Sequence, residues 1–332
     1  MAPLLQAVNI KLSSPKAEYT SYAGEIDPDW LVSRSVPNGG YILALLVNAC
    51  IQYQSTSSHR DPIHVTAHYL TTSVPSHFEI RVRIVKTGHT FTNLTTELYQ
   101  RETLIITAHQ IFGNNSASPQ ASTRGLTLAP PSSYARRLPL YTHPSTAVVR
   151  PGRSVWKFQS HITIAPDPQI LAKNAPDHPN RTSAPTIGGE GLEWGAWLTF
   201  QNKSDKITPT SLAFLADVFK HMPGLMPPSE RPSLGRSWFP TIVLSLEFKA
   251  PIPSSSATHA RRTVGLYSSG KFLNDGRHDG YVEVWTAPCD IGEGKEIPGW
   301  REKQVCIAVA KQMASIIPIE VNMKRGKNEI KL

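Results

Sequence analysis

Cysteine is scarce in this chain, and long apolar runs are absent. The three cysteines, Cys50, Cys289 and Cys306, are too few and too scattered for a disulfide framework or a zinc site. No stretch approaches the ~18 uninterrupted apolar residues of a membrane helix. The first residues have a short apolar patch and no basic start, which argues against a signal peptide. The sequence therefore predicts a protein of a reducing compartment, with no bound metal and no membrane partner.

The motifs of several common enzyme classes are also missing. No Gly-X-Ser-X-Gly sequence occurs, so the nucleophile elbow of the α/β-hydrolases is absent. No Walker-type loop is present, and the run Gly188-Gly189-Glu190-Gly191 does not open a helix after a strand. No cofactor is predicted.

Positive charge is in excess but thinly spread. The chain has 34 Lys and Arg against 25 Asp and Glu, a formal net charge of +9. The densest local groups are Arg136-Arg137, Arg261-Arg262 and the tail residues Lys324, Arg325, Lys327 and Lys331. No basic and aromatic platform of the RNA-binding kind accompanies them, so nucleic acid is not an expected partner. A basic rim would suit a small molecule that carries a nucleotide, such as coenzyme A.

Hydrophobic patterning in the first half predicts one buried helix followed by an antiparallel sheet. Residues 36–52 are apolar on all sides after a Pro-Asn-Gly-Gly opening, in which Asn38 is a suitable cap. Alternating segments rich in β-branched residues follow at 62–72, 77–87, 90–101 and 103–112. Earlier segments around 16–24 and 28–33 could supply additional strands. A curved sheet wrapped around one helix is the hotdog plan.

The same order recurs in the second half. A helix is predicted at 208–220, and strands are predicted at 154–165, 192–200, 239–249, 261–271, 280–286 and 303–312. Residues 113–153 have the composition of a linker. The predicted fold class is α+β, a double hotdog with two helix-wrapped antiparallel sheets in one chain. The predicted domains are an N-terminal hotdog at 1–125, a linker at 126–153, a C-terminal hotdog at 154–320 and a basic tail at 321–332.

Three polar residues in the second half are candidates for chemistry. Asp217 lies within an apolar helical run, where a buried carboxylate is costly unless it is hydrogen-bonded. The simple alternative is a position on the exposed side of the helix. Thr241 opens a strand and Gln312 ends one, and each has a plain structural explanation when taken alone. Four tryptophans fit core packing better than a pocket lining: Trp156, Trp194, Trp197 and Trp238.

Taken together, the candidates occur in an order that resembles the bacterial type II acyl-CoA thioesterases and their thioesterase-like fungal relatives. The matching segments are Pro37-Asn38-Gly39-Gly40-Tyr41, Leu215-Ala216-Asp217, Pro240-Thr241-Ile242 and Ala310-Lys311-Gln312. The resemblance covers most of residues 20–112 and 190–318. It implies catalysis by water that Asp217 activates, while Thr241 and Gln312 hold that water or polarise the carbonyl. It also implies a substrate-binding role for the opening of the first helix, at Asn38, Gly39, Gly40 and Tyr41.

The function that this resemblance implies is hydrolysis of an acyl-CoA or carrier-bound acyl thioester. Two alternatives stay open, because fold alone does not fix function. One is a tailoring enzyme of secondary metabolism, a cyclase, isomerase or pericyclase that folds a polyketide or terpenoid in an apolar pocket. The other is a non-catalytic binder of lipids or acyl carriers. Two departures from the family pattern support keeping them: the strand 243–249 lacks the family's His-containing polar residues, and residues 287–302 form a Pro/Gly-rich insertion.

The expected location is the cytoplasm. The last residues, Glu329-Ile330-Lys331-Leu332, only loosely resemble the Ser-Lys-Leu ending of peroxisomal proteins, so the peroxisome is the weaker alternative. The expected partner is a small-molecule substrate, either an acyl thioester or a hydrophobic metabolite. The oligomeric state, including a homo-oligomer, is left open.

Overall fold

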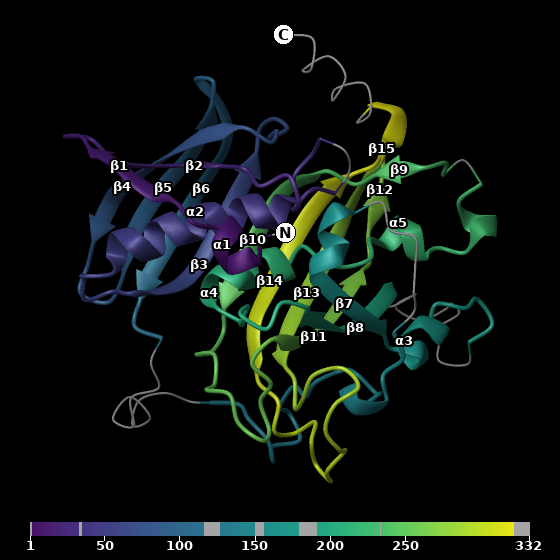
Figure 1. The fold of residues 1–332 in the computed structure, drawn as a ribbon. Coiled ribbons are helices and arrows are strands. Elements are labelled where there is room, and N and C mark those ends of the chain that lie inside the picture. The colour runs from purple at the N-terminus through teal and green to yellow at the C-terminus, as the bar shows by residue number, and fades with distance from the viewer. Residues whose placement is uncertain are drawn as a thin grey trace.

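A computed structural model gives the fold and describes residues 2–32, 35–115, 127–149, 156–178, 191–232 and 234–321 (Figure 1). The N-terminal half contains α1 (Leu4–Ala7), β1 (Lys11–Pro15), β2 (Thr20–Glu25), α2 (Gly39–Gln54), β3 (Asp61–Tyr69), β4 (His77–Thr87), β5 (Thr92–Gln100) and β6 (Thr103–Gly113). The C-terminal half contains η2 (Pro144–Thr146), η3 (Lys157–His161), β7 (Ile162–Pro166), α3 (Pro168–Ala172), β8 (Leu192–Phe200), α4 (Pro209–Leu215), α5 (Met222–Leu225), η4 (Pro228–Glu230), β9 (Ser237–Trp238), β10 (Thr241–Phe248), β11 (Thr263–Gly270), β12 (Leu273–Asn274), β13 (Arg277–Thr286), β14 (Cys306–Ser315) and β15 (Ile317–Pro318). In each half, a buried helix precedes a meander of strands.

One antiparallel sheet joins the two halves. It has 13 strands in the order β1-β2-β4-β5-β6-β3-β10-β14-β13-β11-β8-β7, with β12 paired to β13. The halves meet where β3 pairs with β10, with His64 opposite Glu247 and His68 opposite Val243. Every pairing between the strands named above is antiparallel. The predicted α+β double hotdog is confirmed, and its two sheets are continuous.

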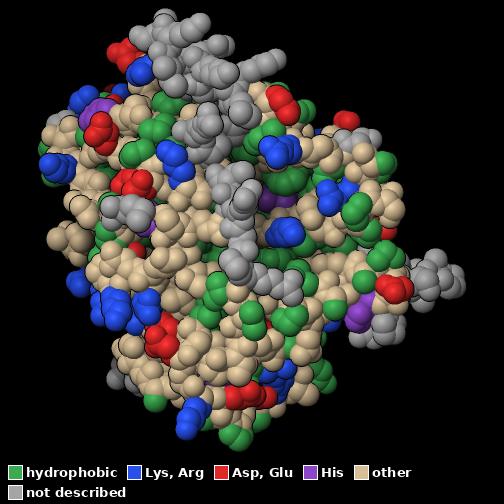
Figure 2. All heavy atoms as spheres, turned by 45° about the vertical axis from the view of Figure 1, so that its right-hand side comes forward, with side chains coloured by type: hydrophobic (Ala, Val, Ile, Leu, Met, Phe, Trp, Pro, Cys, Tyr) green, Lys and Arg blue, Asp and Glu red, His purple; other side chains and the backbone are tan. Residues whose placement is uncertain are grey.

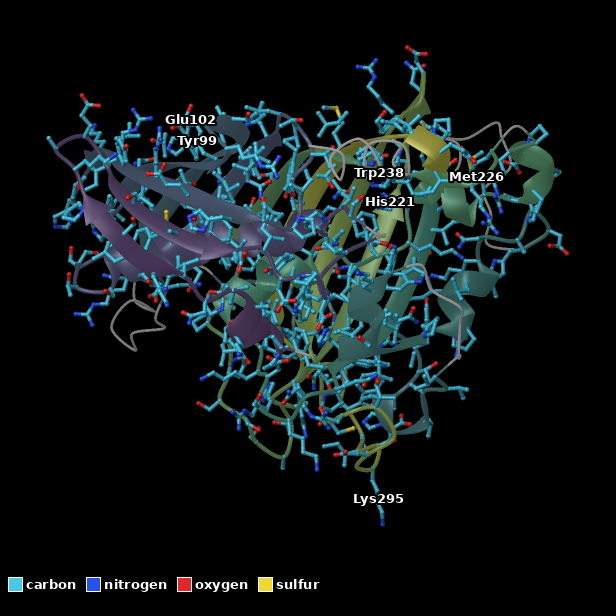
Figure 3. All side chains as sticks on the ribbon, turned by 45° about the horizontal axis from the view of Figure 1, so that its top comes forward. Tyr99, Glu102, His221, Met226, Trp238 and Lys295 are labelled. Carbon is cyan, nitrogen blue, oxygen red and sulfur yellow. The ribbon has the colours of Figure 1, made fainter. Side chains whose placement is uncertain are left out.

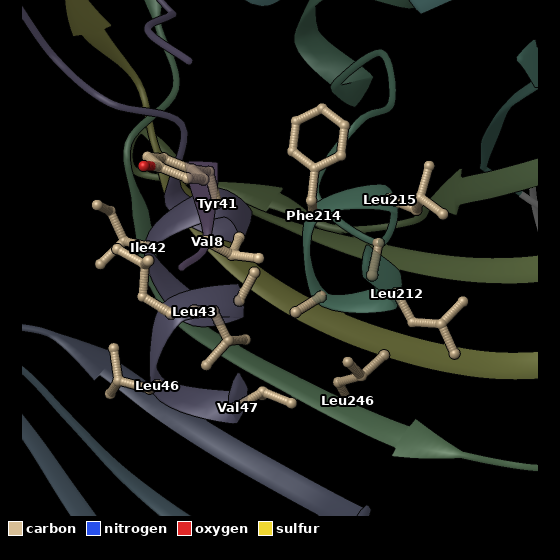
Figure 4. Packing of buried hydrophobic residues seen from close by; sticks show 14 of the residues in the cluster. Val8, Tyr41, Ile42, Leu43, Leu46, Val47, Leu212, Phe214, Leu215 and Leu246 are labelled. Atoms are coloured by element: carbon tan, nitrogen blue, oxygen red, sulfur yellow. The ribbon is translucent and has the colours of Figure 1, made fainter. Parts of the chain in front are cut away.

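The helix α2 is enclosed by the sheet on one side and by α4 on the other. Figure 4 shows apolar side chains of both helices, among them Val47 and Leu212, gathered with Leu246 of β10. Each fully buried Leu or Val contributes about 1.5–3 kcal/mol relative to an exposed one. A helix with apolar residues on every side is therefore stable only in such an enclosed position, which is what the sequence pattern predicted for it.

The end of α4 is fixed by aromatic packing. Phe214 is fully buried and meets the Trp30 ring edge-on at 5.0 Å and the Phe158 ring edge-on at 5.3 Å, measured between ring centroids. The helix stops at Leu215, earlier than the predicted end at residue 220. The Asp217 N–H donates to the Phe214 carbonyl, three residues back, at 3.0 Å, so the last turn is tightened. Asp217 therefore stands just beyond the helix.

The structure also corrects two predicted strands. In the segment 28–33, expected to supply a strand, the described residues form a turn with a single bridge between Leu31 and Pro37. The turn begins where the Asp27 carboxylate accepts from the Asp29 N–H (2.8 Å), a local bond that competes with strand pairing. Within the predicted strand 154–165, residues 157–161 form a 3₁₀ helix and only the last residues belong to β7.

A second, smaller hydrophobic cluster covers the opposite face of the C-terminal part of the sheet. Trp197, Trp285 and Trp300 pack there with Leu138 and Leu140. Both leucines lie in the predicted linker 126–153 and are fully buried, so this part of the segment is packed onto the C-terminal half. The predicted domain boundaries themselves remain predictions.

Across the described parts of the chain, no helix is both long and apolar enough to cross a membrane. The predicted basic tail, 321–332, lies outside the described residues except for Val321.

Candidate active site

The carboxylate of Asp217 lies where the two hotdog halves meet. Its Oδ2 accepts hydrogen bonds from the Gly40 N–H (2.8 Å) and from the Asn38 side-chain amide (3.1 Å), both at the start of α2. Its Oδ1 accepts from the Gln312 side-chain amide of β14 and from the Thr241 hydroxyl of β10 (3.4 Å). Donors from one helix and two strands thus converge on one carboxylate.

The opening of α2 is shaped for a close approach to Asp217. The Asn38 Oδ1 caps the helix by accepting from the Tyr41 N–H (2.9 Å), and this orientation directs the Asn38 Nδ2 toward the carboxylate. At Gly40 a Cβ would lie 2.5 Å from the Ala213 carbonyl oxygen and 2.6 Å from the Asp217 Cβ. Only glycine therefore lets α2 and α4 come this close, and the positive end of the helix dipole faces the carboxylate.

Thr241 and Gln312 reach Asp217 from adjacent strands of the sheet. The β10–β14 register places Leu244 opposite Gln312 and Thr241 opposite Ala314. The Gln312 Nε2 also donates to the Thr241 hydroxyl (2.9 Å), so the amide links the hydroxyl to the carboxylate. The other amide atom, Oε1 of Gln312, is buried without a partner among the described residues. The three side chains that the sequence singled out form one hydrogen-bonded group.

The environment of Asp217 makes it a stronger base than an ordinary carboxylate. Burial raises its pKa from 3.8 to about 6, and the hydrogen bonds from Gly40, Gln312, Thr241 and Asn38 offset only part of this effect. The group is therefore ionised at neutral pH and yet close enough to its pKa to accept a proton. A base with a pKa near the working pH is the most effective kind in general base catalysis.

Asp217 and Thr241 lie in the wall of a cavity of about 690 Å³. Most of the wall is apolar, with large contributions from Trp156, Phe158, Phe219, Trp238 and Phe239. Figure 2 shows hydrophobic side chains gathered around a hollow on this face of the molecule. Figure 3 shows Trp238 and His221, which both line the cavity, near one another. The volume lies within the roughly 300–1,000 Å³ of typical small-molecule sites. The site thus combines a polar wall with room for an apolar ligand.

Of the four residues predicted to bind substrate, three lie at the site and one does not. Asn38 and Gly39 line the cavity, and Gly40 lies against α4 with its N–H on Asp217. Tyr41 does not reach the cavity, which corrects the prediction for this residue. Its ring is fully buried beside Trp30 and its hydroxyl donates to the Ala7 carbonyl (2.9 Å). The helical period explains the difference, because Gly39 and Ile42, three residues apart, share the face that lines the cavity, and Tyr41 lies off that face.

Tyr69 is part of the site but was not predicted from the sequence. Its hydroxyl, at the end of β3, donates to the Gly39 carbonyl (2.9 Å) and holds the opening of α2 in place. Burial and the nearby Asp217 charge hold the pKa of Tyr69 well above its usual value, so it is a neutral donor. A tyrosine in a strand carries no sequence signal that separates this role from core packing.

The aromatic wall of the cavity was also only partly predicted. Trp156 and Trp238 line the cavity, whereas Trp194 and Trp197 are buried in the two hydrophobic clusters. The segment between Asp217 and Thr241 adds Phe219 and Phe239 to the aromatic wall, and its position between two candidate residues was the available signal. In the described residues, no group of three or more His, Cys, Asp and Glu side chains is arranged to hold a metal ion.

Two family models match the chain and together cover most of it. The model described as the acyl-CoA thioesterase N-terminal domain matches residues 26–113. The model described as the acyl-CoA thioesterase C-terminal domain matches residues 151–288. The two matches correspond in order and approximate extent to the two halves of the fold.

Two solved bacterial structures have the same fold. A hot dog fold protein of unknown function from Alicyclobacillus acidocaldarius matches with a TM-score of 0.65 and 14% identity, over 95% of this chain and 97% of that one. An acyl-CoA thioesterase II from Mycobacterium marinum matches with a TM-score of 0.62 and 11% identity, over 95% of this chain and 98% of that one. At these identities the likeness shows the fold alone.

One curated protein is related in sequence. The ustilagic acid biosynthesis cluster protein orf2 of Mycosarcoma maydis is 31% identical over 80 residues, which are 24% of this chain and 21% of that protein. The match therefore spans about a fifth of the curated relative.

Proposed function

The chain belongs to the acyl-CoA thioesterase family, and we propose that it hydrolyses an acyl-CoA or carrier-bound acyl thioester with Asp217 as the base that activates water. The observation that carries this proposal is the buried Asp217 carboxylate in the wall of an apolar cavity, surrounded by donors that orient it. The cavity would take the acyl chain, and the carboxylate would face the thioester carbonyl. The proposed catalytic residues are Asp217, Thr241 and Gln312.

The proposed site of the attacking water is beside the Thr241 hydroxyl. At 3.4 Å, this hydroxyl makes the longest of the four contacts with Asp217, and a hydroxyl can rotate to donate to a water instead. Such a water would donate to the Asp217 Oδ1 and attack the carbonyl carbon while its proton passes to the carboxylate. The C–S bond then breaks, and the protonated Asp217 returns the proton to the departing thiolate. Gln312 keeps the carboxylate oriented throughout.

The Gly39 N–H is the proposed donor to the developing oxyanion. The first N–H groups of a helix have no acceptor within the helix, and those of Gly40 and Tyr41 are taken by Asp217 and Asn38. Gly39 lines the cavity, and its N–H donates to no residue that the structure describes. One preorganised donor of this kind contributes about 10²–10³-fold to kcat.

The pH dependence of thiol release tests the assignment of the base. Only ionised Asp217 accepts a proton, and burial places its pKa at about 6. We therefore expect kcat/KM to fall about tenfold per pH unit below pH 6 and to level off above it. Initial rates measured from about pH 4.5 to about pH 8.5 give the profile. If kcat/KM instead stays constant down to the lowest pH, Asp217 does not have the raised pKa, and its role as the base is contradicted.

A tailoring reaction on a hydrophobic metabolite is the second candidate. One observation favours it, the sequence match to a protein named for the ustilagic acid biosynthesis cluster. In that case the cavity would act by holding its substrate in a reactive shape, which requires no base. A panel of short-chain to long-chain acyl-CoAs separates the two. Thiol release from any member supports hydrolysis, and no release from the whole panel would favour tailoring.

A further inference from the structure

A pair of hydrogen-bonded histidines, one of them in the cavity wall, lies outside the Asp217 group. The His221 Nδ1 and the His278 Nε2 are 3.0 Å apart. His221 stands immediately before α5 and lines the cavity, whereas His278, in β13, is buried behind it. The hydrolysis proposed above uses neither ring.

The register of the sheet places this pair beside the proposed catalytic group. His278 lies opposite Ala314, and Gly280 lies opposite Gln312 on the same strand pair. Because alternate residues share a face, His278 and Gln312 are diagonal neighbours on the inner face of the sheet. Diagonal neighbours are about 7–8 Å apart. The first few carbons of an acyl chain whose thioester carbonyl faces Asp217 would therefore lie close to the histidine pair.

Aromatic rings enclose the histidines and keep them neutral. The His221 ring lies 4.6 Å from the Phe219 ring and 5.0 Å from the Phe239 ring, between centroids. Burial lowers the pKa of His221 to about 3 and that of His278 to about 4. At physiological pH both rings are therefore neutral, each with one N–H, and one of the two N–H groups makes the hydrogen bond between them.

Of the two outer ring nitrogens, the His278 Nδ1 is buried without a partner among the described residues, and only the His221 Nε2 belongs to a ring that a ligand in the cavity can reach. The His221 Nε2 has no hydrogen-bond partner among the described residues, and it belongs to the ring that lines the cavity. If His221 donates to His278, its Nε2 is an acceptor, and if it accepts, its Nε2–H is a donor. A hydroxyl group satisfies either arrangement. A purely hydrocarbon ligand would instead remove water from this nitrogen without replacing the hydrogen bond, which is unfavourable.

We propose that His221, held in place by His278, forms a subsite for a hydroxyl substituent on the acyl chain, so that the preferred substrate is a hydroxyacyl thioester. The oxygen lies within the first few carbons from the thioester, with the rest of the chain on the aromatic wall. This proposal rests on the proposed hydrolase function and specifies its substrate class. His221 is then the residue that determines specificity, and His278 positions it.

The test compares 3-, 4- and 5-hydroxyoctanoyl-CoA with octanoyl-CoA. The measured quantity is the ratio of kcat/KM for the hydroxylated and the plain substrate, in the wild type, in His221→Phe and in His221→Gln. Phenylalanine matches the neighbouring aromatic rings but cannot form hydrogen bonds, whereas glutamine retains a donor and an acceptor. For at least one hydroxyl position, the wild-type ratio is expected to be about 10–100, in line with one buried hydrogen bond. It should fall to about 1 in His221→Phe and recover in part in His221→Gln.

Affinity provides a second readout that does not depend on turnover. The same four ligands are titrated into Asp217→Asn, with and without His221→Phe, and the ratio of Kd values should change in the same way. A wild type that cleaves octanoyl-CoA with no preference for any hydroxylated analogue overturns this inference and leaves the proposed hydrolysis intact. An equal loss on all four substrates in His221→Phe also overturns it. If the wild type cleaves none of them, the hydrolase function itself fails.

Discussion

Asp217→Asn is expected to lower kcat for thiol release by about 10²–10⁴-fold, the usual contribution of a positioned general base. Asparagine keeps the size and planar shape of the side chain but cannot take a proton from water. The assay follows thiol release from the best acyl-CoA of a chain-length panel, with wild type and variant compared above pH 7, where the wild-type carboxylate is ionised.

The same substitution should preserve the fold and make it more stable. The carbonyl of the new side chain can accept from Gly40 and Asn38, while its amide meets Gln312, whose Oε1 is unpaired in the wild type and becomes available once the Gln312 amide turns over. Burial raises the pKa of Asp217 to about 6 from 3.8, so the folded state binds this proton more tightly than the unfolded chain does. Ionisation above pH 6 therefore opposes folding, by about 3 kcal/mol at most, from 1.36 kcal/mol for each unit of pKa.

Thermal unfolding measures this effect. At pH 7.5 the variant should melt at a higher temperature than the wild type, and the difference should shrink as the pH falls from about 6 to below about 4, where the unfolded chain is also protonated. If the variant has a low kcat and also melts at a lower temperature than the wild type, Asp217 holds the structure together. The loss of kcat would then not identify Asp217 as a base.

Gly40→Ala is expected to have the second-largest effect. The added methyl would stand 2.5 Å from the Ala213 carbonyl oxygen and 3.0 Å from the Phe214 Cα. Both are backbone atoms, so α2 and α4 must separate instead of a side chain turning away. The Gly40 N–H would move off Asp217, and a displacement of about 1 Å in a catalytic group costs about 10²-fold in rate. Overpacking of this kind also destabilises by about 1–3 kcal/mol.

Gly88→Ala is the matched control for Gly40→Ala. Gly88 lies on the surface, and a Cβ there would make only an ordinary contact, 3.4 Å from the Phe91 carbonyl oxygen. Both variants are assayed for kcat and KM and checked by circular dichroism. Gly88→Ala should resemble the wild type. Wild-type kcat in a folded Gly40→Ala would show that the close approach of α2 to Asp217 has no part in catalysis.

The fold was predictable because its signals are periodic and repeated. An apolar helix followed by alternating strands occurs twice, and the structure contains both copies within one sheet. The strand expected at 28–33 is replaced by a turn because of a local bond between Asp27 and Asp29. The error at the end of α4 has another origin, because contacts between distant residues decide the conformation there. The five residues before Asp217 are apolar or neutral and continue the helical pattern. The helix α4 nevertheless ends at Leu215, before Asp217, because donors of α2, β10 and β14 hold the Asp217 carboxylate.

The candidate site was predictable to the extent that it follows residue order in the family pattern. Asp217, Thr241 and Gln312 are 24 and 71 positions apart, and no local pattern indicates that they meet. Tyr41 was misplaced because four residues at the opening of α2 were treated as a block, whereas the helix turns about 100° per residue. The positions of Tyr69 and His278 depend on the strand register, which the sequence does not specify to one residue.

The most direct test of water activation is a single turnover in H₂¹⁸O with enzyme in excess over acyl-CoA. Mass spectrometry of the product acid and of the peptide that contains Asp217 then locates the label. Direct attack by a water held on Asp217 predicts one ¹⁸O in the first product acid and none in Asp217. Attack by the carboxylate itself would form an anhydride, and its hydrolysis at the Asp217 carbonyl would put the label in Asp217 and leave the product acid unlabelled. That second pattern would contradict the account.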